Sequence, residues 1–260
     1  MRSVPLMFSI LLGSIVSLAA VDVHDRAVTS GSPAARQSNQ RKDPREYADS
    51  LKELDAIIRS SPDLWEAYDV RANLFMQKRN WPAALQDLNS TIRLQPAFFE
   101  ASWKRSIVYL HLRNYAASLK DLDALAKVTF QTQHPHELAL TLSQRAWIRA
   151  TCPDGSFRNG RAAIADAKKA CELIKWKYAD YIDTLAGACA EAGDFDSAVR
   201  YEQQAIDLNR SGKDETIQKT GNPVGDKVAV MMANKAQQSL PGYFKRLELY
   251  KQHRPYRDTK

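Results

Sequence analysis

"YDVRANLFMQKRNWPAALQDLNSTIRL" (Tyr68–Leu94) and "SWKRSIVYLHLRNYAASLKDLDALAKV" (Ser102–Val128) are two copies of one pattern, set 34 residues apart. Their matched pairs include Arg71 with Arg105, Asn80 with Asn114, Trp81 with Tyr115, and Asp87 with Asp121. Apolar residues recur in both copies at helical spacing, and the paired asparagines stand where a side-chain oxygen caps a second helix. The period therefore predicts a repeated pair of helices.

The same pattern continues on both sides of these two copies. A later copy is "DYIDTLAGACAEAGDFDSAVRYEQQAIDLNR" (Asp180–Arg210), and a half copy, "EYADSLKELDAIIRSSP" (Glu46–Pro62), comes first. One position in each unit holds a small residue that lets the two helices approach closely: Ala72, Ser106, Ala146 and Ala186. A helix pair of this size cannot bury its apolar face alone, so we expect the pairs to stack on one another.

This pattern resembles the tetratricopeptide repeat (TPR) family. The resemblance is carried by the 34-residue length, by Ala72 and Phe75, by Ala84 and Ala198, and by the closing Pro62 and Pro96; Cys189, where an aromatic residue is usual, departs from it. It implies an all-α fold, a right-handed solenoid of helical hairpins with C-terminal capping helices. We predict a half repeat or N-terminal helix at 44–62, full repeats at 65–98, 99–132, 139–177 and 179–212, capping helices at 226–252 and a basic tail at 253–260.

The stretch "RATCPDGSFRNGRAA" (Arg149–Ala163) contains the residue types of a reactive or phosphate-binding loop. The repeat register gives another interpretation. Arg71 and Ala84 are 13 residues apart, whereas the matching pair around this loop, Arg145 and Ala163, are 18 apart. The stretch is therefore a helix–helix turn lengthened by five residues, with a proline to end one helix and an asparagine to cap the next. Its cysteine has no second cysteine nearby and no histidine within fifteen residues, which favours a connector over an active site.

A closer resemblance concerns the third and fourth repeats. The succession ATCPD…ACEL…DTLA…AEAGDF between residues 150 and 195 looks like a TPR subtype of bacterial, often exported proteins. The segment "RLELYKQHRPYRD" (Arg246–Asp258) resembles the end of the same module. This resemblance implies a protein-interaction module with no catalytic residues, no cofactor and no metal to carry over.

The first twenty residues differ from the rest of the chain. Arg2 is followed by "VPLMFSILLGSIVSLAA" (Val4–Ala20), an uncharged run of 17 residues that ends in small residues. This order predicts a signal peptide over 1–20, and hence a periplasmic or extracellular protein. The run is near the lower limit for crossing a bilayer, so an uncleaved membrane anchor is the alternative. Residues 21–43 are polar and without an apolar period, which predicts a flexible linker.

The formal net charge of +7 lies largely in the tails, since residues 243–260 hold six Lys and Arg against two Asp and Glu. There is no basic stripe interleaved with aromatic residues, so we expect no nucleic-acid partner. Three cysteines are too few for a disulfide framework in an exported protein, and we predict buried free thiols at Cys171 and Cys189. "HPHE" (His134–Glu137) has no partner histidine at helical spacing, so we predict no metal site there.

Arginine and aspartate recur together in three of the repeats. Arg71, Arg105 and Arg145 hold one position, and Asp87, Asp121 and Asp166 hold another. Both change together in the fourth repeat, to Leu185 and Tyr201. Joint retention and joint loss predict an ion pair between the two helices of a repeat, for which the planar guanidinium is suited.

In a TPR stack the second, fifth, ninth, twelfth and thirteenth residues of each first helix line the concave face; we call these the inner positions. The resemblance places the partner-binding groove at Asn73, Met76, Gln77, Trp103, Ile107, Leu110, His111 and Trp147. Asp69 stands where TPRs that grip a C-terminal carboxylate have lysine. We therefore expect an extended segment or a helix with apolar anchors as the ligand. One alternative is that either tryptophan, or both, packs between repeats instead.

The sequence thus predicts an exported TPR scaffold that binds a protein or peptide and is not an enzyme. Two other classes stay open. One is a cell-envelope structural protein, anchored by its N-terminus, that contacts anionic polymer through its basic tails. The other is a hydrolase with an unrecognised site.

The prediction about export is tested at the N-terminus. Because a small-residue exit follows a short apolar run, we expect cleavage after Ala19 or Ala20. N-terminal sequencing of the protein from the periplasm or medium of its source measures this. A membrane-bound chain that still begins at Met1 would instead support the anchor.

Overall fold

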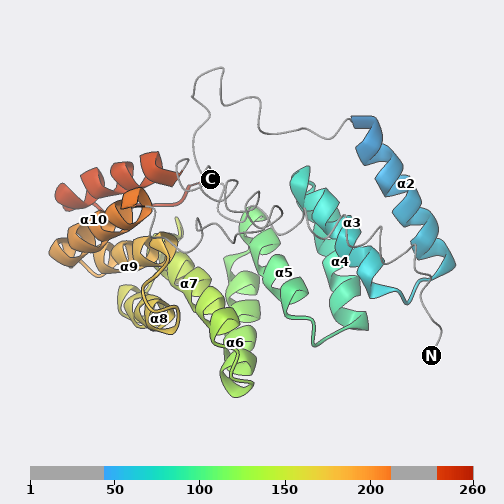
Figure 1. Ribbon diagram of the computed structural model, residues 1–260, viewed down its shortest axis with the longest axis horizontal. Helices are drawn as coiled ribbons and strands as arrows, with labels where there is room; N and C mark the ends of the chain where they lie inside the picture. The colour runs from blue at the N-terminus through green and yellow to red at the C-terminus, as the bar shows by residue number, and fades with distance from the viewer. Residues whose placement is uncertain (1–43, 212–238, 260) are drawn as a thin grey trace. The chain divides into compact units, whose positions relative to one another are not determined.

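The computed structural model describes residues 44–211 and 239–259. Its helices are α2 (Pro44–Ser60), α3 (Trp65–Gln77), α4 (Trp81–Leu94), α5 (Phe99–His111), α6 (Tyr115–Gln131), α7 (Pro135–Thr151), α8 (Gly160–Leu173), α9 (Ala179–Glu191) and α10 (Phe195–Ser211), with a further helix over 239–251, called the C-terminal helix (Figure 1). No strand occurs in these ranges. The predicted all-α fold of consecutive helical hairpins is confirmed. The predicted signal peptide, the linker and the first capping helix lie outside the described residues.

The chain divides into two compact units, one up to Asp121 and the other from Leu122 onward. In the first unit, α2 and α3 share a small core around Leu54 and Val70, and a second core forms around Ala72, Leu88 and Val108. The main core of the second unit includes residues of α7, α8, α9, α10 and the C-terminal helix. Each unit therefore has an apolar core of its own.

Close approach of paired helices explains the small residues of the repeat. Ala72 of α3 and Ala84 of α4 are completely buried, and so are Ala186 of α9 and Ala198 of α10. In the second repeat the matching residues are serines, and the Ser118 hydroxyl donates to the Ser106 carbonyl at 2.8 Å. Larger side chains at these positions would push the two helices apart, because the interior has no free volume to accept them.

The tight turn between paired helices is built the same way in three repeats. Arg79, Arg113 and Gly193 take left-handed backbone conformations, and the next residue donates its backbone N–H back to the helix just ended. Caps then begin the second helices: Asn80, Asn114, Asn159 and Asp194 each accept the backbone N–H three residues on. The caps predicted at the three asparagines are confirmed, and Asp194 caps the fourth repeat in the same way.

The predicted arginine–aspartate pairs form in all three repeats. Nε and Nη2 of Arg71 bind the two carboxylate oxygens of Asp87 at 2.7 Å each. Arg105 holds Asp121 in the same way at 2.8 Å. Two parallel bonds fix the rotation of one helix against the other as well as their distance.

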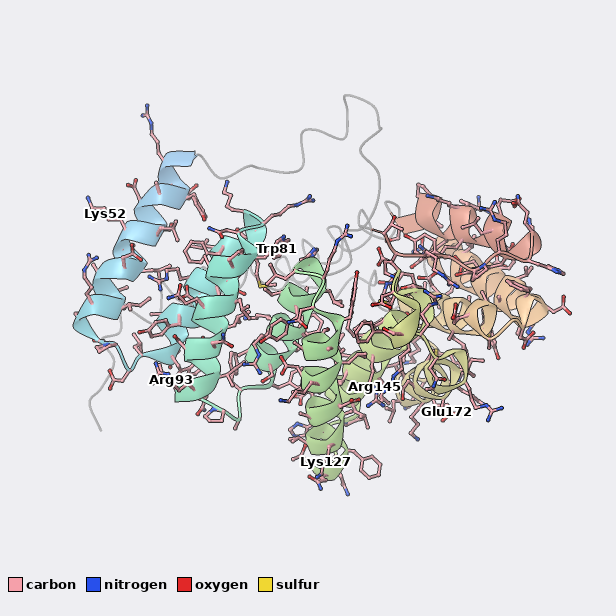
Figure 2. All side chains as sticks on the ribbon, turned by 180° about the vertical axis from the view of Figure 1, so that it is seen from behind. Lys52, Trp81, Arg93, Lys127, Arg145 and Glu172 are labelled. Carbon is pink, nitrogen blue, oxygen red and sulfur yellow. The ribbon has the colours of Figure 1, made fainter. Side chains whose placement is uncertain are left out.

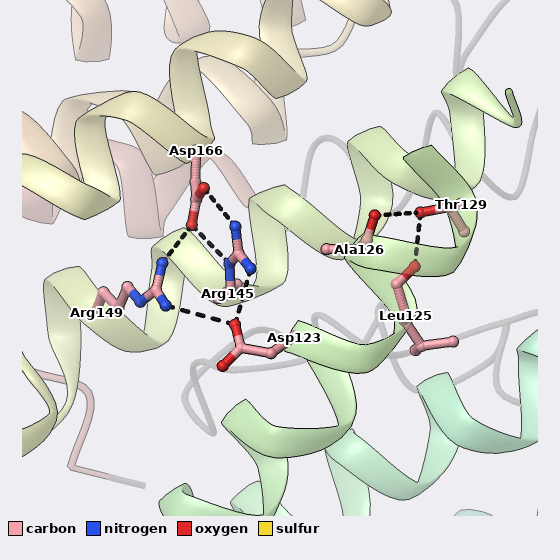
Figure 3. A network of polar contacts seen from close by, with 7 residues as sticks. All are labelled: Asp123, Leu125, Ala126, Thr129, Arg145, Arg149 and Asp166. Carbon is pink, nitrogen blue, oxygen red and sulfur yellow. Dashed lines mark hydrogen bonds and ion pairs between the residues drawn. The ribbon is translucent and has the colours of Figure 1, made fainter. Parts of the chain in front are cut away.

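The structure adds a second partner residue for each arginine, which the sequence did not predict. The remaining Nη1 of each arginine reaches the second helix of the preceding repeat: Arg71 binds Asp55 at 2.6 Å, Arg105 binds Asn89 at 2.9 Å, and Arg145 binds Asp123 at 2.8 Å. Figure 3 shows the third case, in which Arg149 also binds Asp166, at 2.8 Å. Each arginine therefore joins three helices and couples one repeat to the next.

Because these ion pairs are largely buried, they specify how the helices pack more than they stabilise the fold. Desolvation raises the pKa of the Asp87 carboxyl, and the bonds from Arg71 offset that rise only in part. The carboxylate is thus held in an environment that disfavours its charge. Removing one member of such a pair strongly destabilises the fold, whereas replacing both members by an apolar pair of the same volume is tolerated.

We expect Arg105→Leu to lower the free energy of unfolding by roughly 3 kcal/mol, because Asp121 then keeps a charge without its partner. Arg105→Leu with Asp121→Tyr copies the fourth repeat and should recover much of that loss. Chemical denaturation of the double-mutant cycle measures the coupling. Asn89→Ala, which removes only the third contact, serves as the control and should cost about 1 kcal/mol or less. Additive losses would contradict the pairing.

Candidate functional site

The inner positions of α3 and α5 surround a buried ion pair in the first unit. Lys104 Nζ lies 2.7 and 2.8 Å from the two carboxylate oxygens of Asp69. Asn73 donates from Nδ2 to the same carboxylate at 3.4 Å. The side chains of Asp69 and Lys104 are only 10% and 15% exposed. Asp69 stands where TPRs that grip a C-terminal carboxylate have lysine. Its charge is therefore neutralised by Lys104 of the neighbouring helix.

The seven predicted groove residues of this unit differ in accessibility. Asn73, Ile107 and Leu110 are buried, whereas Met76 and Trp103 are half-buried. Gln77 and His111 are exposed at the ends of α3 and α5. The His111 ring stacks on Trp81 with ring centres 3.8 Å apart; Trp81, at the start of α4, is labelled in Figure 2.

Trp103 has an unsatisfied polar atom. Its indole Nε1 is buried and finds no acceptor among the described residues. An unpaired buried donor costs about 1–3 kcal/mol, so an acceptor that reached it would bind favourably. The accessible surface of this inner face thus consists of an indole, a thioether, an amide and an imidazole.

Trp147, the eighth predicted groove residue, belongs to the second unit and is covered by the chain's own C-terminus. Its Nε1 donates to Asp258 at 3.1 Å, and its ring lies 5.9 Å from that of Tyr256. The Arg246 guanidinium lies over it, 5.5 Å from the ring centre. The inner face of this unit is therefore occupied by residues that were predicted to be a cap and a tail.

The C-terminal helix docks on α9 and α10. Tyr243, Leu247 and Tyr250 of this helix are buried, as expected for the predicted cap. The Tyr243 hydroxyl donates to Asp180, and Arg246 Nε donates to Asp183 at 2.5 Å. Asp180 and Asp183 hold inner positions of α9, so this helix covers the inner face as well as the end of the stack.

The lengthened turn between α7 and α8 is structural in its details. Asp154 accepts from the backbone and hydroxyl of Ser156, and the Arg158 Nη1 donates to the Cys152 carbonyl at 2.8 Å. A Cβ on Gly160 would lie 2.6 Å from the backbone nitrogen of Ala192. The first turn of α8 therefore packs directly on the end of α9, which explains why glycine replaces the aromatic residue found there in other repeats.

The cysteines of this unit are buried free thiols, as predicted for Cys171 and Cys189. Burial raises the pKa of Cys171 to about 12 and that of Cys189 to about 11. Among the described residues no group of three potential ligands could hold a metal ion; His134 Nδ1 lies 3.0 Å from the Glu137 carboxylate. None of the described helices is long and apolar enough to cross a membrane.

Comparison with known proteins bears on the fold. No family model matches the sequence, and no curated protein matches it. A similar solved structure is "MamA 41-end from Desulfovibrio magneticus RS-1", with 17% identity and a TM-score of 0.51 over 64% of this chain and 87% of that chain. The "MamA RS-1 ArsTM double mutant" has 18% identity and a TM-score of 0.50 over the same shares. MamA is a TPR protein. This chain has a TPR fold.

The TPR register also explains a buried acid that the sequence analysis missed. Glu202 falls where the first two repeats have Leu88 and Leu122, and it is fully buried. Its Oε1 lies 3.4 Å from Arg246 Nε. A charged residue at a leucine position of the repeat is the signal that would have revealed this cluster. The C-terminal helix places the Arg246 guanidinium beside this acid.

Burial, together with the nearby Asp183 carboxylate, raises the pKa of Glu202 well above its usual range, and Arg246 opposes this. The folded chain therefore keeps a proton that the unfolded chain releases near the ordinary glutamate pKa of about 4.3. Stability from this group is present below that pH and is lost as pH rises towards the folded pKa.

We expect Glu202→Gln to remove this loss, because the amide mimics the neutral acid. The unfolding free energy of the variant relative to the natural chain should rise with pH by up to about 1.4 kcal/mol per unit. Denaturation from pH 5 to 8 measures it, with Glu248→Gln as an exposed control. Parallel profiles for Glu202→Gln and the natural chain would mean that Glu202 is ionised in the fold.

Proposed function

We propose that this chain is an exported, non-catalytic TPR scaffold that binds a protein or peptide segment on the inner face of α3 and α5. The observation that carries the proposal is the half-buried Trp103 at an inner position, with a buried indole N–H that lacks an acceptor among the described residues. Helical-repeat folds use such faces for extended ligands. Tryptophan is also enriched among residues that dominate binding energy.

The chemistry of this face favours an apolar anchor with backbone contacts. The Asp69–Lys104 pair is internally neutralised, so it offers little attraction to a charged ligand end. Met76 supplies an adaptable apolar surface, and Gln77 supplies an amide with both donors and an acceptor. A ligand carbonyl that turned the Trp103 ring towards itself would satisfy the indole N–H.

Export is the second part of the proposal and rests on the sequence of residues 1–20. The buried, high-pKa thiols are consistent with it, since they form no disulfide and react slowly as thiols. Membrane association is proposed only if that segment stays uncleaved.

The test compares tryptophan variants of the chain that begins at residue 21. Partners captured from the envelope of the source are quantified for each variant. Trp103→Ala should reduce capture of a specific partner at least tenfold, about 1.4 kcal/mol. Trp103→Phe keeps the ring without the N–H and should lie between.

Trp176→Ala is the matched control, because Trp176 lies in the turn before α9 and away from the inner positions. Each variant is first compared with the natural chain for thermal stability. Equal capture by natural and Trp103→Ala chains of equal stability would refute the assignment of this face.

A further inference from the structure

The last residues of the chain, 253–259, leave the C-terminal helix and run back over α9 and α7; we call them the C-terminal tail. Arg257 Nη2 lies 2.7 Å from the Glu191 carboxylate. The backbone N–H of Asp258 donates to the Thr151 carbonyl at 2.9 Å, and its carboxylate accepts from Trp147. One segment thus makes an ion pair, a main-chain bond and a side-chain bond within two residues.

These contacts fall on inner positions of the repeats. Trp147 and Thr151 are the ninth and thirteenth residues of the third repeat, counted from Ala139, and Glu191 is the thirteenth of the fourth, counted from Ala179. The tail therefore lies where a TPR ligand lies, and it is held by main-chain and side-chain groups together, as extended peptide ligands are.

The tail has a defined chemical order. Tyr256 contacts the Trp147 ring and lies under the Arg246 guanidinium, whose carbon is 5.6 Å from the tyrosine ring centre. Arg257 is 30% exposed in its side chain, whereas Asp258 is only 5% exposed. The face thus recognises an aromatic residue, then a basic residue, then an acid that is buried against an indole N–H.

The helix before the tail has docking contacts of its own, although its Arg246 also lies over Tyr256 of the tail. The C-terminal helix is held by Tyr243, Arg246, Leu247 and Tyr250, which contact α9 and α10. Beyond the helix, the tail adds a His253–Phe195 ring stack and the contacts above. Loss of the tail contacts therefore leaves the buried anchor of the helix in place.

We propose that the inner face of α7 and α9 is a second peptide-binding site, filled at rest by the C-terminal tail in cis. In trans it takes an extended segment with an aromatic, a basic and an acidic residue in succession. A tail tethered this closely has an effective concentration on the order of millimolar, so a free ligand competes with it and the site is gated. This site is separate from the face of α3 and α5 and does not depend on it.

The experiment uses a labelled synthetic peptide of residues 253–260, "HRPYRDTK", and the chain from residue 21 in two forms. One form is full-length and the other ends at Gln252. The peptide should bind the shortened chain at least tenfold more tightly than the full-length chain. A peptide with the substitution Arg257→Glu, which reverses the charge of the residue that pairs with Glu191, should lose that binding.

Two further variants make the readout specific to the site. Trp147→Phe in the shortened chain removes the donor to Asp258 but keeps a ring, and should weaken the peptide at least threefold. If the shortened chain is not folded, the full-length chain with Arg257→Ala and Asp258→Ala replaces it, since its loosened tail should admit the natural peptide.

Three outcomes would overturn the proposal. Equal affinity for full-length and opened chains would place the peptide elsewhere. An absence of binding to a folded, opened chain would make the tail a packing element only. Dimerisation of the full-length chain that the peptide reverses would identify a second copy's tail as the occupant instead of the chain's own.

Discussion

A buried arginine fork that ties three helices together is the constraint on which the repeat depends. Arg71 closes its own hairpin through Asp87 and reaches back to the preceding repeat through Asp55. Ridges-into-grooves packing of side chains still leaves a scatter of about 15–20° in the angle between two helices, whereas two parallel bonds to one carboxylate favour a single orientation. The fork therefore sets the register of each hairpin and of the step to the next, and the alanines beside it set the distance.

The fourth repeat shows what replaces this constraint where the arginine and aspartate are absent. Leucine and tyrosine take the fork positions, and a carboxyl appears instead at the buried position of Glu202. That acid is fully buried, and its basic neighbour is Arg246 of the C-terminal helix. A buried acid that loses its neighbouring polar groups costs free energy. Glu202 therefore makes the fourth repeat depend on the C-terminal helix that covers it.

The two inner faces differ in what covers them. In the second unit the terminal helix and tail approach α9 and α7 from the inner side, so their tyrosines, arginines and aspartate cover the positions that a ligand contacts in this fold. In the first unit the corresponding positions surround a neutralised Asp69–Lys104 pair and a tryptophan with an unsatisfied donor. One chain thus contains an inner face with an unsatisfied donor and an inner face that is covered by its own residues 253–259.

The sequence by itself determined the hairpins, their caps, the small residues at each crossing and the arginine–aspartate pairs, because all of these recur at one period and each is a local requirement of backbone or charge. The resemblance to TPR repeats also placed Trp103 and Trp147 at inner positions. Only the tertiary structure decided what covers them. The third contact of each arginine, the close approach at Gly160, the partner of Glu202 and the return of Tyr256–Asp258 over Trp147 join residues that share no period. Such contacts depend on the angle and distance between neighbouring helices. Side-chain packing sets both, and no regular spacing in the sequence reports them.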